Sequence, residues 1–126
     1  MPTSVRRPRP MDNRELVEGL CEASVPLREA RRLHLESYGT LIPHVFMAEV
    51  LKHIGGCLGM GGQHLESNRP ELERVMVVIE RGMAEGDRET RNVIAISFAR
   101  DSELELFFDQ LQPMLGPRTR AELNGK

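Results

Sequence analysis

The chain has 126 residues, a formal net charge of −2, 40% hydrophobic residues and 29% charged residues. These values predict one globular domain that can bury a core without metal or disulfide support, and they exclude a disordered chain. Because only 4% of the residues are aromatic, we expect an aliphatic core of Leu, Ile, Val and Met. No segment has the length or purity of a membrane span, which argues against a membrane partner.

The charges are distributed unevenly along the chain. The first ten residues contain three Arg and no acid, whereas residues 11–116 contain 11 basic and 18 acidic residues, a net charge of −7. An acidic body argues against nucleic-acid binding by the domain and favours a basic protein partner. We interpret residues 1–10 as a flexible basic tail, residues 11–116 as a helical domain and residues 117–126 as a short C-terminal turn or tail.

The two cysteines, Cys21 and Cys57, match neither a disulfide framework nor a CxxC zinc motif. No apolar segment follows the basic N-terminus, so the sequence predicts no signal peptide. We therefore expect reduced thiols and a cytoplasmic protein.

The first two helices are marked by their end signals. Asp12 and Glu15 have capping-box spacing, which predicts a helix over residues 13–23. Pro26 in a first turn and Gly39 just past a last turn delimit a second helix.

A third helix is predicted to begin at Pro43. It is apolar on several sides over three turns, so we expect it to be central. We expect Gly55 and Gly56 to end it and an irregular stretch over residues 55–69 to follow, because clustered glycines disfavour a helix.

The fourth helix is predicted to open at residues 68–70, with Glu71 in its first turn, and to end at Gly86. Asp87 is a good N-cap for a fifth helix, although the apolar segment VIAISFA that follows is also compatible with a strand.

The spacing of Ser102 and Glu105 predicts a sixth helix, which Pro113 and Gly116 would close. The sequence thus predicts an all-α fold, a compact bundle of five to six helices in antiparallel hairpins. Stacking of the fourth and fifth helices as in an α-solenoid is the alternative.

Three potential ligands, His53, Cys57 and His64, surround the glycine-rich loop. Imidazole and thiolate suit zinc or copper. However, their spacing matches no closed motif and a fourth ligand is missing. We therefore expect no metal and no other cofactor. As an alternative, we keep a metal- or small-ligand-binding protein or enzyme that uses His44 or this loop.

His44 is a candidate functional histidine, since it could act as a general base. No Ser or Cys nucleophile with an orienting third group is apparent in the sequence. We expect His44 to anchor its helix, we predict no catalytic residues, and we expect the chain not to be an enzyme.

An acidic stretch without any base is a candidate partner-binding site. On a helix, residues four apart share a face, so its acids would form a patch that docks a basic protein, with a solvated face as the alternative. Its members are Asp101, Glu103, Glu105 and Asp109.

Two segments carry a family resemblance. Residues 36–46, ESYGTLIPHVF, resemble the G-x-L-x-P-H-V opening of a family of small bacterial proteins of unknown function. Residues 84–98 are similar to its second signature, a Gly-Asp turn followed by N-x-I-A-x-S-F. The resemblance covers residues 35–110 and implies an all-α fold and a role as an immunity-type interaction protein in bacterial toxin systems.

We therefore expect a non-enzymatic protein-binding domain, with an immunity protein that neutralises a basic bacterial toxin as its specific form. The alternatives are the metal- or ligand-binding protein or enzyme described above, and a dimeric regulator whose basic tail contacts nucleic acid. A homodimer is compatible with each of these hypotheses.

Overall fold

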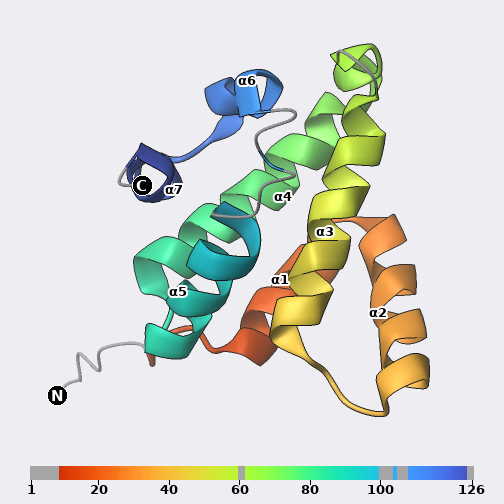
Figure 1. Cartoon of the computed structure of the whole chain (residues 1–126), viewed down its shortest axis with the longest axis vertical. Helices are drawn as coiled ribbons and strands as arrows, with labels where there is room; N and C mark the ends of the chain where they lie inside the picture. Colours follow the sequence, from red (N-terminus) through yellow and green to blue (C-terminus); the bar gives the residue numbers. More distant parts are fainter. Residues whose placement is uncertain (1–8, 60–61, 100–103, 105–107, 125–126) are drawn as a thin grey trace, which may run out of the picture.

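The computed structural model describes residues 9–59, 62–99, 104 and 108–124, and this part of the chain is all-α (Figure 1). The predicted fold class is therefore confirmed, with seven α-helices in the described residues instead of the expected five to six. In chain order the helices are α1 (Asn13–Ala23), α2 (Val25–Tyr38), α3 (Pro43–Leu58), α4 (Leu65–Glu85), α5 (Arg88–Ile94), the π-helix η2 (Ala95–Ala99), α6 (Phe108–Leu111), the 3-10 helix η4 (Gln112–Met114) and α7 (Pro117–Asn124).

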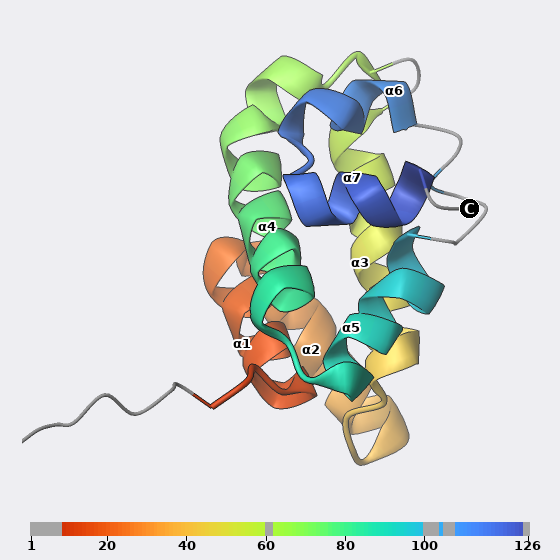
Figure 2. The same ribbon diagram turned by 90° about the vertical axis from the view of Figure 1, so that its left-hand side faces the viewer.

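Helices α3 and α4 are the two longest helices of the described residues, and they pack against each other (Figure 1). Helix α1 packs against α4 and α2, while α2 packs against α3. Helix α5 and η2 pack against α3 and α4. Helix α7 packs against α4 and η2, and Figure 2 shows that its axis crosses the direction of α4. Helix α3 is thus central, as its apolar sequence predicted.

One hydrophobic core joins these helices. Each buried Leu, Ile or Phe side chain contributes roughly 1.5–3 kcal/mol relative to exposure, so the core is the main source of stability. Its fully buried members include Leu16, Leu20, Phe46, Met47, Ile54, Leu72, Ile79 and Phe98.

The predicted ends of the first two helices are confirmed. Asp12 accepts a hydrogen bond from the Glu15 backbone N–H at 2.9 Å, and the Glu15 carboxylate accepts one from the Asp12 N–H at 3.1 Å. Ser24 is the N-cap of α2 and accepts from the Leu27 N–H at 3.3 Å. Gly39 ends α2 at a φ of 74°, a left-handed conformation that favours glycine.

The expectation that Gly55 and Gly56 end the third helix is wrong, because α3 continues to Leu58. Burial of Cys57 and Leu58 in the core outweighs a cost of roughly 1 kcal/mol for each helical glycine. The helix ends at Gly59, whose φ is 71°.

The predicted start of the fourth helix is also wrong, since α4 begins at Leu65 and includes Pro70. Proline removes one backbone hydrogen bond, here the one to the carbonyl of the exposed Glu66. The Asn68 side chain donates to the Cys57 carbonyl at 2.8 Å and ties the first turn of α4 to the last turn of α3. Much of the predicted irregular stretch is therefore helical.

The fifth helix forms as predicted, with Asp87 accepting from the Thr90 N–H at 2.8 Å. Its apolar continuation is the π-helix η2 and not a strand. Ser102 and Glu105 lie outside the described residues, and α6 covers only the end of the predicted sixth helix. In the described part of the chain, no helix is both long and apolar enough to span a membrane.

Candidate metal-binding site

Two side chains of α3 and one of α4 converge on a single point. His53 and Cys57 are four residues apart and therefore share a face of α3. Nε2 of His53 lies 3.3 Å from the Cys57 Sγ and 2.6 Å from Oε2 of Glu71, which comes from α4. The Cys57 Sγ lies 4.0 Å from the other Glu71 oxygen. One ligand atom from each residue thus lies within 4.8 Å of the other two.

Ser24 adds a hydroxyl to this cluster. It donates a hydrogen bond to Oε2 of Glu71 at 2.5 Å, and its oxygen lies 3.5 Å from Nε2 of His53. Because Ser24 is also the N-cap of α2, the cluster joins the start of α2 to α3 and α4. We call His53, Cys57, Glu71 and Ser24 the histidine–cysteine–glutamate cluster.

The cluster is sheltered but can be reached from solvent. Ser24 and Cys57 are buried, whereas the side chains of His53 and Glu71 are 22% and 19% exposed. Burial alone would raise the pKa of the Glu71 carboxyl, but hydrogen bonds from Ser24 and His53 hold its pKa below the usual value. Burial, with the Glu71 charge as a second cause, raises the pKa of the Cys57 thiol to about 11.

The donor set of the cluster suits zinc. A four-coordinate zinc ion with bonds of about 2.0–2.3 Å places neighbouring ligand atoms roughly 3.4 Å apart. The His53 Nε2 lies 3.3 Å from the Cys57 Sγ, close to this value. The two Glu71 oxygens lie 2.6 Å from that nitrogen and 4.0 Å from that sulfur, on either side of it. A modest outward movement of the Glu71 carboxylate would admit an ion, with the Ser24 hydroxyl or a water as fourth ligand. The thiol would lose its proton on binding.

The third member of the group is Glu71 and not His64. His64 is exposed at the start of α4, where its ring lies 3.5 Å from the Gln63 amide nitrogen. Of the proposed loop trio, the structure therefore unites only His53 and Cys57. Glu71 could have been found from the predicted fold. When two antiparallel helices are joined by a short turn, the last turns of the first helix lie beside the first turns of the second.

His44 is exposed and its Nδ1 is hydrogen-bonded to the hydroxyl of Ser97 in η2. This serine–histidine contact was not apparent in the sequence. In the described part of the chain, no carboxylate is hydrogen-bonded to the His44 ring, so the third group that would orient it for catalysis is missing there.

The start of α3 is held by His34, which the sequence analysis did not single out. His34 is buried, and its Nε2 accepts a hydrogen bond from the backbone N–H of Ile42, the N-cap of α3, at 3.0 Å. Nε2 must therefore be unprotonated, so Nδ1 carries the proton and donates to Glu49 at 3.0 Å. His34 thus ties the start of α3 to α2, and His44 joins the same end of α3 to η2 through its contact with Ser97.

The predicted acidic partner site lies mostly outside the described residues. Asp101, Glu103 and Glu105 belong to the segment that the structure does not describe, and Asp109 is exposed on α6. This site stays a prediction. The second thiol, Cys21, is buried in α1 and donates to the Leu27 carbonyl at 3.6 Å.

Fold and site define a small all-α domain with a histidine–cysteine–glutamate cluster where the start of α2 meets α3 and α4. A family model described as a domain of unknown function (DUF7674) matches residues 18–125, and the chain belongs to this family. No curated protein and no solved structure was found to match the chain. The match agrees with the resemblance to a small family of unknown function and includes every residue of the cluster, but it assigns no role to them.

Proposed function

We propose that the protein binds a transition-metal ion of the zinc class through His53, Cys57 and Glu71. The observation that carries the proposal is the convergence of an imidazole nitrogen, a thiol sulfur and a carboxylate oxygen within 4.8 Å, from two helices. Mixed nitrogen and sulfur ligands favour zinc or copper over calcium and magnesium, which prefer oxygen.

A metal at this position would stabilise the fold. The ion would bridge α3 and α4, and its neighbour Ser24 would couple it to the start of α2. An ion that binds only the folded chain adds about 2.7 kcal/mol to the free energy of unfolding at a concentration of about 100 times its Kd.

The experiment is a calorimetric titration of the metal-stripped full chain with zinc, together with elemental analysis of the loaded protein. We expect one zinc per chain, and a loss of affinity of at least about 100-fold in each of His53→Ala, Cys57→Ser and Glu71→Gln. His64→Ala and Cys21→Ser are matched controls that should bind as the unaltered chain does. Absence of binding, or equal affinity in ligand and control variants, would contradict the proposal.

We also propose a second function, the non-enzymatic binding of a basic partner protein, with toxin neutralisation by an immunity protein as its specific form. A groove of about 570 Å³ between α2 and α3 supports it, because Leu33 and Tyr38 on its α2 side are 48% and 51% exposed. The net charge of −7 over residues 11–116 favours a partner with a basic surface.

The test of this second function is co-expression with basic toxins encoded beside the gene. We expect the unaltered chain to rescue growth in the presence of such a toxin, and we expect Leu33→Glu to abolish this rescue. Val77→Glu is the matched control, since Val77 is 59% exposed on α4 and does not line the groove. Absence of rescue with every neighbouring toxin, or equal loss in both variants, would contradict this role for the groove.

A further inference from the structure

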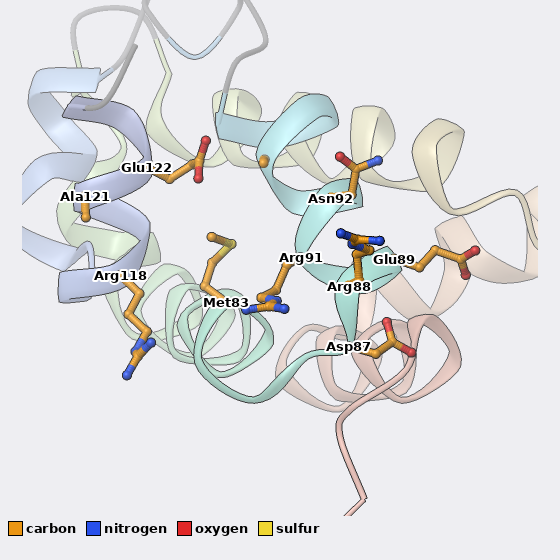
Figure 3. A pocket seen from close by; sticks show the side chains of 10 residues that line it. Met83, Asp87, Arg88, Glu89, Arg91, Asn92, Arg118, Ala121 and Glu122 are labelled. Atoms are coloured by element: carbon orange, nitrogen blue, oxygen red, sulfur yellow. The ribbon is translucent and has the colours of Figure 1, made fainter.

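A second site lies on the opposite end of α4 from the cluster. The last turn of α4, helix α5 and helix α7 enclose an open groove of about 1170 Å³ (Figure 3). Its lining combines three arginines, Arg88, Arg91 and Arg118, with an apolar floor.

The three arginines are exposed, and no hydrogen bond or ion pair within the described residues engages their guanidinium groups. Elsewhere on the surface, Arg32 and Arg69 are paired with glutamates of their own helices. The guanidinium groups of these three arginines are therefore available to a bound anion.

The acids in the same lining do not offset the arginines through direct contacts. Asp87 caps α5 by accepting from the Thr90 N–H, and Glu89 accepts from the Asn13 side chain at 2.8 Å. Glu122 also has an interaction of its own.

The wall that carries Arg118 is fixed in place. The Glu80 carboxylate of α4 accepts the backbone N–H groups of Arg118 at 3.0 Å and of Thr119 at 2.9 Å, and also the Thr119 hydroxyl at 2.9 Å. Glu80 therefore caps α7 and occupies its N-terminal donors. The backbone N–H of Arg118 is therefore occupied, and its guanidinium group is the part that can contact a ligand. Because α7 is already held in place, binding need not order this helix.

The floor gives the groove an apolar contact surface. Met83 is half-buried, and Figure 3 shows its side chain between Arg91 and Arg118. Ala95 is buried beside it, and Asn92 adds an amide at the edge. Such a lining suits a molecule that is anionic at one end and apolar at the other.

We propose that this groove binds a small organic anion with at least two negative charges and an apolar portion, of the phosphate-ester or polycarboxylate class. Arg91 and Arg118 bind the anionic group, with Arg88 as the third cation, because guanidinium groups pair bidentately with phosphate and carboxylate. The apolar portion packs on Met83. The site shares no residue with the metal ligands, so it stands independently of the first proposed function.

The test records the amide chemical shifts of the full chain at low salt, with phenyl phosphate, phenylmalonate and inorganic phosphate as probes. We expect shifts at residues 83, 91, 92 and 118 with phenyl phosphate or phenylmalonate, and tighter binding of phenyl phosphate than of inorganic phosphate. Stronger binding of phenyl phosphate than of phenylmalonate would indicate a phosphate-ester ligand, and the reverse order would indicate a polycarboxylate ligand.

Matched variants separate the groove from general charge effects. We expect the double substitution Arg91→Gln with Arg118→Gln to weaken binding at least about 10-fold. The control, Arg32→Gln with Arg69→Gln, removes the same charge outside the groove and should change binding less than about 2-fold. Equal weakening in both double variants, shifts located elsewhere, or no binding of phenyl phosphate and phenylmalonate would overturn the proposal.

Discussion

Two histidine–glutamate pairs link helices of this protein, and they differ in what surrounds the imidazole. His34 pairs with Glu49 between α2 and α3, and its side chain is fully buried. Both ring nitrogens are used, one by Glu49 and one by the Ile42 N–H, while the ring packs on Tyr38 at a centroid distance of 4.7 Å. Every polar atom of this ring therefore has a structural partner.

His53 pairs with Glu71 between α3 and α4, but its Nε2 faces three groups at once. One of them is the Cys57 sulfur, a soft ligand, whereas the hydrogen bonds that the structure describes for His34 go to Glu49 and Ile42. Its side chain is 22% exposed, so an ion can reach it. The comparison shows that a histidine–carboxylate pair becomes a candidate metal site when one ring nitrogen faces further ligands and solvent has access.

The first prediction concerns the pair we regard as structural. His34→Ala should destabilise the fold by about 2–4 kcal/mol, because it leaves a cavity and removes the acceptor of the Ile42 N–H. Urea denaturation at neutral pH measures this. His44→Ala is the control and should cost less than about 1 kcal/mol, since His44 is exposed. A small loss in His34→Ala would remove the distinction between the two pairs.

The second prediction concerns metal-linked stability. Zinc at about 100 times its Kd should add about 2.7 kcal/mol to the free energy of unfolding of the unaltered chain. The same zinc concentration should leave Cys57→Ser nearly unchanged, because the sulfur ligand is gone. Thermal unfolding with and without zinc measures both, and equal stabilisation of the two chains would place the ion elsewhere.

The third prediction concerns Glu71 in the metal-free chain. Glu71→Gln should cost about 1–2 kcal/mol at neutral pH, since it weakens the hydrogen bonds from Ser24 and His53. The folded-state pKa of Glu71 lies below its ordinary value of 4.5, so its contribution is present above that pH and is lost as the pH falls through the folded-state pKa. The variant should therefore lose less stability than the unaltered chain between about pH 5 and pH 3.

The measurement for Glu71 is urea denaturation across this pH range. Glu29→Gln is a suitable control, since Glu29 is exposed and its pKa is also lowered, by its contact with Arg32. Its stability at neutral pH should change little. Parallel pH profiles of Glu71→Gln and the unaltered chain would contradict the lowered folded-state pKa of Glu71.

The smallest expected effect concerns thiol reactivity. Burial raises the pKa of both thiols, that of Cys57 to about 11, so both should react slowly with iodoacetamide at neutral pH in the folded chain. Zinc should slow the alkylation of Cys57 further and leave that of Cys21 unchanged. Mass spectrometry of the labelled peptides measures this, and protection of Cys21 by zinc would contradict the site.

Much of the fold was predictable because its signals are local. The Asp12 capping box, the left-handed Gly39 and the Asp87 N-cap each act within a few residues, and each predicted a helix end that the structure confirms. The boundary near Gly56 is wrong because burial of Cys57 and Leu58 outweighs local propensity. The boundary near Pro70 is wrong because the Asn68 side chain bonds to the Cys57 carbonyl and ties an earlier turn of α4 to α3.

The candidate site was only half predictable for the same reason. The spacing of His53 and Cys57 places them on one helix face, which the sequence shows. The sequence marks Glu71 only as an acid that favours a helix start, and Ser24 was not predicted to have any role. Their convergence on His53 depends on how α2 and α4 pack against α3, which no local pattern specifies.

Cobalt substitution tests the metal site most directly. Co²⁺ added to the metal-stripped chain should give the visible bands of a four-coordinate ion and a thiolate-to-cobalt charge-transfer band in the near ultraviolet. Both bands should appear at one equivalent and persist in Cys21→Ser, and the charge-transfer band should disappear in Cys57→Ser. No charge-transfer band in the unaltered chain, or one that persists in Cys57→Ser, would contradict metal binding through Cys57.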